Sequence, residues 1–226
     1  MLRSLYVMLD YHMIAADGDM GRVRDFLFDD QSWVVHYLVA EIASPLGDRR
    51  VLILPFVAGR PQWETRRLPV LLTSEQIRTS PPLEADMPVA LQQESGLRRP
   101  GAHLRSMQEL LGYGVHTTDG EAGIIEDFII EDTLWGIHHI VVTLKQPGLG
   151  SILLTPESIR SVSWPGKAVW VNLSQQELEK MPPFNADAPV NDDEGGLYDY
   201  HGRPARSHHT SNSEEQIEAC RVGLKT

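Results

Sequence analysis

The sequence predicts an all-β fold: two tandem small antiparallel β-barrels with short helical turns, followed by a flexible C-terminal tail. Two observations lead to this prediction. The chain of 226 residues carries one sequence pattern twice. Within each copy, short apolar segments alternate with turns that contain Gly, Pro and Asp, which is typical of small barrels and curled sheets. Internal repetition determines the architecture before any local pattern does.

The repeat appears as a nearly constant offset along the chain. The opening segment Leu2-Arg3-Ser4 matches Leu104-Arg105-Ser106, an offset of 102 (104 − 2). After one deletion the offset is 101, as in the match of Pro55 to Pro156. The offset of 102 also pairs Leu9, Tyr11, Asp17, Gly18, Gly21, Asp25, Phe26, Asp30, Trp33, His36 and Val39 with Leu111, Tyr113, Asp119, Gly120, Gly123, Asp127, Phe128, Asp132, Trp135, His138 and Val141. The offset of 101 pairs Trp63 and Leu72 with Trp164 and Leu173. We therefore expect a first repeat at 1–90, a linker at 91–101, a second repeat at 102–190 and a polar, disordered tail at 191–226.

Composition restricts the class of protein. The formal net charge is −11, a sign that repels phosphate backbones and anionic lipid, so we expect no nucleic-acid partner and no membrane insertion. No secretory signal opens the chain, and no apolar run is long enough to span a bilayer. Cys220 is the single cysteine, so no intrachain disulfide can form. These features favour a cytoplasmic protein.

Turn and helix signals occupy equivalent places in the two repeats. Asp17-Gly18 and Asp119-Gly120 are the dipeptide favoured in type I′ hairpin turns. Gly21 and Gly123 suit a bulge or a close backbone approach within a strand. A short helix is expected from Ser106, which Glu109 follows at capping-box spacing. Short helical turns ended by a Pro-Pro pair are expected from Thr73 to Thr79 and from Ser174 to Lys180.

The residues that could carry chemistry also fit simpler structural roles. Asp25 and Asp127 each precede a Phe; because neighbouring strand residues face opposite sides, a solvent-facing Asp beside a core Phe explains the pattern without acid–base chemistry. His138 and His139 point to opposite faces for the same reason, and no further ligands accompany them or His36 at metal-site spacing. His201, His208 and His209 lie in the tail with Cys220, which we interpret as a free thiol.

The sequence contains no phosphate loop, dinucleotide-binding glycine pattern or nucleophile elbow. We therefore assign no catalytic, cofactor-binding or metal-binding residue and expect a protein that is not an enzyme and has no cofactor. The aromatic pairs Phe26 with Trp33 and Phe128 with Trp135 are expected to be buried, one pair in each repeat. Three other tryptophans near strand ends either pack inside or contribute to an interaction surface: Trp63, Trp164 and Trp170.

Taken together, the repeated signature resembles the PRC-barrel domain. In the second repeat the signature runs through Leu104-Arg105-Ser106, Asp119-Gly120, Gly123, Asp127-Phe128, Trp135 and Pro156, and the first repeat carries the same pattern. The family takes its name from the cytoplasmic barrel of the photosynthetic reaction centre H subunit, and a related barrel ends the ribosome-maturation factor RimM. The resemblance covers residues 1–190 and implies a small barrel used for docking, with no shared catalytic set.

The resulting functional hypothesis is a non-enzymatic protein-interaction or assembly module whose protein partner is unidentified, with self-association left open. An alternative is a small-ligand-binding or enzyme-accessory protein with a pocket between the repeats. A ribosome- or RNA-assembly factor is a third hypothesis, and the acidic charge counts against it.

Overall fold

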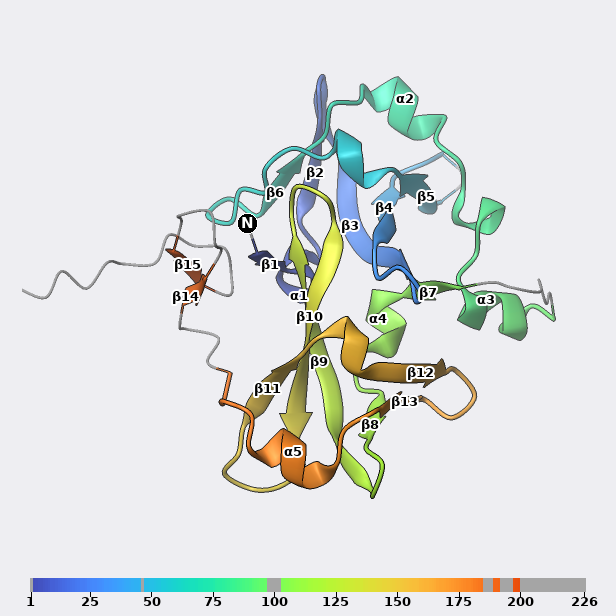
Figure 1. The fold of residues 1–226 in the computed structure, drawn as a ribbon. Coiled ribbons are helices and arrows are strands. Elements are labelled where there is room, and N and C mark those ends of the chain that lie inside the picture. Colours follow the sequence, from blue (N-terminus) through green and yellow to red (C-terminus); the bar gives the residue numbers. More distant parts are fainter. Residues whose placement is uncertain (1, 46, 97–102, 185–188, 192–196, 200–226) are drawn as a thin grey trace, which may run out of the picture.

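The computed structural model describes residues 2–45, 47–96, 103–184, 189–191 and 197–199 (Figure 1). The two repeats share one order of elements from their first strand to a 3₁₀ turn, after which the second repeat has one strand more than the first. The elements of the first repeat are β1 (Leu2–Ser4), α1 (Leu5–Met8), β2 (His12–Ala15), β3 (Gly18–Asp29), β4 (Val35–Ile42), β5 (Arg49–Ile53), the 3₁₀ turn η1 (Pro55–Val57), β6 (Arg67–Pro69), α2 (Ser74–Arg78), the 3₁₀ turn η2 (Leu83–Ala85) and α3 (Val89–Glu94).

The second repeat follows with matching strands and helical turns. Its elements are β7 (Leu104–Ser106), α4 (Met107–Leu110), β8 (Gly114–His116), β9 (Glu121–Glu131), β10 (Gly136–Leu144), β11 (Ser151–Leu154), the 3₁₀ turn η3 (Pro156–Ser158), β12 (Ile159–Ser163), β13 (Ala168–Val171) and α5 (Gln175–Glu179), and the short strands β14 (Pro189–Asn191) and β15 (Leu197–Asp199) come after it. The predicted linker is helical at its start, because α3 reaches Glu94. None of the described helices is long and apolar enough to cross a membrane.

Each repeat contributes one open, mixed sheet. The first has the order β5-β4-β3-β2-β6 and the second β11-β10-β9-β8-β13-β12. The mostly β architecture is as predicted, but the antiparallel prediction is incomplete: β2 pairs with β6 in parallel, and so does β8 with β13. Strands far apart in sequence can join in either direction, so the hairpin signals that suggested antiparallel pairing contain no information about these pairs. Among the described residues neither sheet closes into a barrel.

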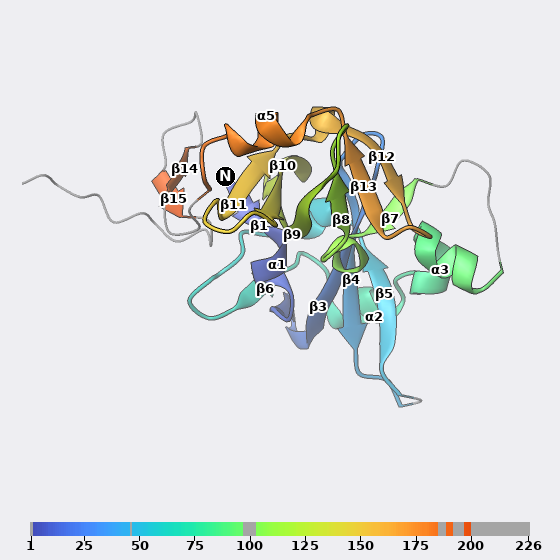
Figure 2. The same cartoon turned by 90° about the horizontal axis from the view of Figure 1, so that it is seen from below.

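The two repeats exchange their first strands. β1 of the first repeat pairs antiparallel with β9 of the second, with Arg3 opposite Ile130. β7 of the second repeat pairs in the same way with β3 of the first, with Arg105 opposite Phe28. In Figure 1, β1 and β7 lie at the level where the two sheets meet, and Figure 2 shows β1 next to β9. The chain is therefore an intertwined pair related by a pseudo-twofold axis, with matching surfaces buried as in a symmetric dimer.

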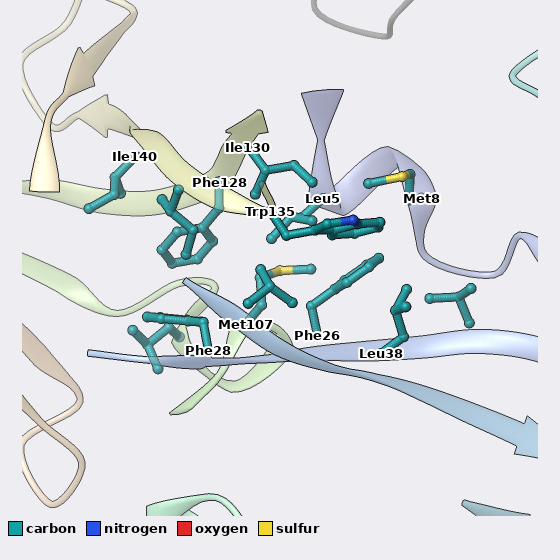
Figure 3. Close-up of a cluster of buried hydrophobic side chains, with 14 of the residues drawn as sticks. Leu5, Met8, Phe26, Phe28, Leu38, Met107, Phe128, Ile130, Trp135 and Ile140 are labelled. Carbon is teal, nitrogen blue, oxygen red and sulfur yellow. The ribbon is translucent and has the colours of Figure 1, made fainter. Parts of the chain in front are cut away.

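One hydrophobic core spans both repeats. Phe26, Phe28, Trp33, Phe128 and Trp135 all belong to it and are almost inaccessible to solvent, which confirms the predicted burial of both aromatic pairs. The rings of Trp135 and Phe26 stack across the repeat boundary with centroids 6.2 Å apart, and those of Phe28 and Phe128 lie 5.4 Å apart. Figure 3 shows Trp135 above Phe26. Neither repeat thus has a complete core without the other.

Two glycines are required by close backbone approach. A Cβ atom at Gly21 would lie 2.1 Å from the carbonyl oxygen of Glu41, and one at Gly123 would lie 2.2 Å from that of Thr143. Atoms cannot approach so closely without backbone movement, so the expectation of a close approach is confirmed at both positions. The ladders also shift register nearby, between Met13 and Ile14 and between Val115 and His116.

The predicted type I′ turns are wrong. Ala15 pairs with Gly18, so Ala16 and Asp17 are the central residues, and neither has the positive φ that this turn requires. The aspartate instead holds the turn against a helix. The amide and hydroxyl of Ser74 both donate to Asp17 Oδ1 at 2.7 Å, which lowers the pKa of the Asp17 carboxyl. In the second repeat the amide of Gln175 donates to Asp119 Oδ1 at 2.9 Å.

Candidate functional site

The repeat junction is built around two carboxylates, the buried Asp127 and the partly buried Asp25. Asp127 has no exposed surface. It accepts hydrogen bonds from the hydroxyl of Ser4 and, at 2.9 Å, from the amide of Tyr6, both in the first repeat. Asp25 does the same in reverse, accepting from the hydroxyl of Ser106 and, at 3.0 Å, from the amide of Gln108. Each carboxylate thus caps the short helix that follows the exchanged strand of the other repeat.

This arrangement corrects the prediction that Asp25 and Asp127 face solvent. Phe26 does point into the central core, and Asp25 does lie on the opposite face of β3. That second face is also covered, because Leu27 packs with Leu83 and Leu104 in a separate apolar cluster. Alternation along a strand determines which face a residue occupies but contains no information about what covers that face.

Ion pairs reinforce the exchange at the residue that precedes Ser4 or Ser106 in each exchanged strand. Arg3 Nε lies 2.7 Å from Asp132 Oδ2, and the equivalent Arg105 Nε lies 2.5 Å from Asp30 Oδ2. His103 Nδ1 also lies 3.0 Å from Asp30 Oδ1. The arginine and aspartate side chains are between 6% and 15% exposed, so solvent screens them less than it screens ordinary surface pairs.

A cavity of about 210 Å³ opens beside Asp25. Both repeats and α3 contribute to its lining. One part of the wall is apolar, with Leu27, Val39, Leu83 and Leu91; the other is polar, with Asp25, Arg50, Glu94, Ser106, Gln108 and Glu109. The place of Glu109 in the second repeat corresponds to Val7 in the first (109 − 102), which packs in the apolar cluster around Ile129 and Val141. The junction is therefore chemically asymmetric.

Two carboxyl groups in this cavity bind protons more tightly than usual. Burial raises the pKa of Asp25 to about 6, partly offset by hydrogen bonds from Ser106, Gln108 and Phe26. Burial, together with the nearby charges of Asp25 and Glu94, raises the pKa of Glu109 to about 7. Glu109 also accepts a hydrogen bond from the Tyr113 hydroxyl. The cavity therefore changes its charge near neutral pH.

Replacing Asp25 with Asn should remove part of the pH dependence of stability. The folded pKa of about 6 exceeds the ordinary 3.8, so the contribution of Asp25 to stability is complete below about pH 4 and is lost as pH rises through 6. The increase in the pKa of Asp25 on folding corresponds to about 3 kcal/mol of stability, because each pKa unit is worth about 1.4 kcal/mol. Between pH 4 and 7, the free energy of unfolding of Asp25→Asn should increase by up to that amount relative to the wild type.

Urea denaturation at several pH values measures this difference. Asp17→Asn is the control: the pKa of Asp17 is lowered below its ordinary 3.8, so the contribution of this carboxylate is complete above about pH 5, and the difference between this variant and the wild type should stay nearly constant from there to pH 7. A constant difference between Asp25→Asn and the wild type from pH 4 to 7 would show that Asp25 titrates normally.

An apolar face on the first repeat distinguishes it from the second. Leu54, Phe56 and Leu71 are 47%, 75% and 79% exposed. Phe56 lies in η1, and the amide of Leu71 donates to the Val57 carbonyl at 2.8 Å, so η1 and the end of β6 are neighbours. The equivalent residues of the second repeat are Thr155, Glu157 and Asn172, which are also exposed. We call Leu54, Phe56 and Leu71 the apolar face.

The same fold tolerates polar residues at these positions. The bond from the amide of Asn172 to the Ser158 carbonyl, at 2.9 Å, is equivalent to the one made by Leu71. The backbone geometry is thus shared while the side-chain character differs. Folding therefore does not account for the apolar face. An alignment of the two repeats would have revealed the apolar face from the sequence, because each of its three residues is aligned with a polar residue.

The remaining candidate residues are distributed over the surface. His36 and His138 are exposed, and His139 is partly buried with a lowered pKa caused mainly by desolvation. The Nδ1 atom of His139 is buried and has no hydrogen-bond partner among the described residues. Trp170 is partly exposed and stacks on His116 at 5.4 Å, and Trp63 and Trp164 are also partly exposed. His201, His208, His209 and Cys220 lie outside the described residues.

No protein-family model matches the chain, and no curated protein is similar to it in sequence.

Proposed function

We propose that this protein is a protein-interaction or assembly module built from two PRC-barrel-like repeats, and that it docks through the apolar face of the first repeat. The supporting observation is the difference between equivalent positions: Leu54, Phe56 and Leu71 are exposed where the second repeat carries exposed Thr, Glu and Asn. Isolated exposed apolar residues are common, but neighbouring ones on one face are typical of interaction sites. The resemblance of both repeats to a docking domain agrees with this proposal.

The intertwined core suits such a role. Because the repeats share one core and exchange strands, the chain holds its surfaces in fixed relative positions. A rigid scaffold loses little conformational entropy when it binds. Only one of the two equivalent faces is apolar, so the pseudo-symmetric chain would bind asymmetrically.

Exchanging the apolar face for its counterpart tests the proposal. We expect the triple variant Leu54→Thr, Phe56→Glu, Leu71→Asn to lose association, either with itself in sedimentation experiments or with proteins cross-linked to the wild type in its host. Surface substitutions of this kind should change the free energy of unfolding by only about 0.5 kcal/mol each. The matched control places Thr155→Leu, Glu157→Phe and Asn172→Leu on the second repeat. Unchanged association of the first variant in both assays would contradict docking through this face.

A second candidate function is small-ligand binding in the cavity beside Asp25. The observation that favours it is the combination of apolar and ionisable walls in a space of about 210 Å³ between the repeats. Polar groups that converge in an apolar pocket are typical of ligand sites. Its volume is below the usual range for drug-sized ligands, so the apolar face remains the stronger basis for a function.

A further inference from the structure

A cavity of about 220 Å³ opens at the end of the second sheet that lies farther from the first repeat, next to α5 (Figure 1). Its floor is apolar and consists of Ala122 near the start of β9, Leu144 at the end of β10 and Leu178 of α5, all of them buried. Leu149, from the loop between β10 and β11, adds an apolar wall. We call this the Ala122 cavity.

The first repeat carries a longer side chain at the position of Ala122. Its counterpart is Met20 (122 − 102), which is 8% exposed and belongs to the core. Met20 extends beyond Cβ by Cγ, Sδ and Cε, whereas Ala122 ends at Cβ. The neighbouring core positions stay large and aliphatic in both repeats: Ile42 and Ile77 in the first, Leu144 and Leu178 in the second. The second repeat thus keeps the apolar surroundings of this position without its long side chain.

Backbone geometry holds the wall formed by Leu149 in place. Gly148 and Gly150, on either side of Leu149, have φ values of +92° and +68°, a left-handed conformation that favours glycine. The amide of Leu144 donates to the Gly150 carbonyl at 3.0 Å and closes the loop. Leu149 is partly buried and packs against the core. The loop therefore returns an apolar side chain to the cavity instead of leaving it in solvent.

The rim of the Ala122 cavity is polar and carries more negative than positive charge. Lys145 Nζ lies 2.6 Å from Glu121 Oε1, and this contact lowers the pKa of Glu121, which is therefore ionised at neutral pH. Glu179 of α5 adds a second carboxylate, and Gln146 and Gln175 add amide groups. Two carboxylates against one ammonium favour a cationic group at the rim over an anionic one.

We infer that the Ala122 cavity binds a small organic ammonium ion, with its hydrocarbon body on the apolar floor and its charged group at the rim beside Glu121 and Glu179. A buried apolar cavity of about 150 Å³ is large enough for benzene, and drug-sized ligands need about 300 Å³ or more, so the body is about the size of one ring. Burial of the body supplies the affinity and the rim selects the charge. The site lies within the second repeat and does not depend on the proposed function.

Titration of the isotope-labelled full-length protein with benzylamine tests the inference. At neutral pH the amine of this probe is protonated. We expect saturable shifts of the backbone amide signals of Ala122, Leu144 and Leu149. Benzoate, which has the same ring and the opposite charge, should bind at least about fivefold more weakly, the size of effect that exposed ion pairs produce. Shifts that do not saturate, or benzoate binding as tight as that of benzylamine, would overturn the inference.

Reciprocal substitutions test whether the missing side chain creates the site. Ala122→Met gives the second repeat the side chain of the first and should abolish the benzylamine shifts at Leu144 and Leu149. Met20→Ala is the matched control, because it makes the opposite change in the other repeat and should leave those shifts unchanged. Retained binding in a folded Ala122→Met protein would contradict binding on the apolar floor.

A rim variant tests the same site without altering the core. Glu179 is exposed, so Glu179→Gln should leave folding intact even if Ala122→Met does not fold. We expect it to weaken benzylamine binding while the affinity for benzyl alcohol, the neutral probe with the same ring, stays the same. Equal losses for both probes, or unchanged benzylamine affinity, would contradict selection of an ammonium group by the rim.

Discussion

Replacing Trp135 by alanine is expected to lower the free energy of unfolding by about 3–5 kcal/mol, the range for removing a large core aromatic residue. Trp135 is 5% exposed and belongs to the core shared by both repeats. Its ring stacks on Phe26 of the other repeat, so the substitution leaves a cavity at the boundary between them. The loss should therefore affect the whole molecule, with one cooperative transition at lower denaturant concentration.

The neighbouring Leu134→Ala is the matched control for this experiment. Leu134 is 78% exposed, so its truncation should change the free energy of unfolding by no more than about 0.5 kcal/mol. Chemical denaturation of both variants gives the comparison. A loss below about 1 kcal/mol for Trp135→Ala would place this tryptophan outside a packed core and would make it a candidate binding residue instead.

Asp127→Ala should produce the second large effect, a loss of about 3–5 kcal/mol. The substitution removes the acceptor for the Ser4 hydroxyl and for the amides of Tyr6 and Phe128. Each buried donor left without a partner costs about 1–3 kcal/mol. Asp127→Asn should cost less, because its amide oxygen still accepts from both backbone amides and its nitrogen can donate to Ser4 Oγ.

Glu126→Ala provides the comparison for the Asp127 variants. Glu126 is the preceding residue of β9 and is exposed, and its hydrogen bonds reach only Thr143 and Ser151 at the surface. We expect it to be far less destabilising. Equal denaturation midpoints for Asp127→Ala and Glu126→Ala would contradict the view that the carboxylate of Asp127 holds the exchanged helix.

Much of the fold could be predicted because it depends on local patterns that occur twice. The repeat gave the common order of elements, and the Phe and Trp positions gave the core. The tight glycines Gly21 and Gly123 were recognisable because only a residue without a side chain fits such a backbone approach. The short helical turns after Thr73 and Ser174 were also predicted and are present as α2 and α5. The capping box was predicted at Ser106, where the amide of Glu109 donates to Ser106 Oγ.

The junction could not be predicted because it depends on contacts between distant segments. A strand such as Leu2–Ser4 can pair with β3 or with β9, since both carry the same signature, and their local sequences contain no information that separates the two choices. The partly buried position of Asp25 and the buried position of Asp127 follow from that pairing. The sequence did contain one signal: Ser4 and Asp25 recur together as Ser106 and Asp127, as partners in a conserved internal contact would.

The exchange of strands is the central claim, and amide–amide nuclear Overhauser effects measure it most directly. In the exchanged arrangement, the backbone of Arg3 lies opposite Ile130 and that of Arg105 lies opposite Phe28. Cross-strand effects should therefore connect residues 2–4 with 129–131 and residues 104–106 with 27–29. Effects between residues 2–4 and 27–29, with the matching set between 104–106 and 129–131, would show two separate repeats and would contradict the shared architecture.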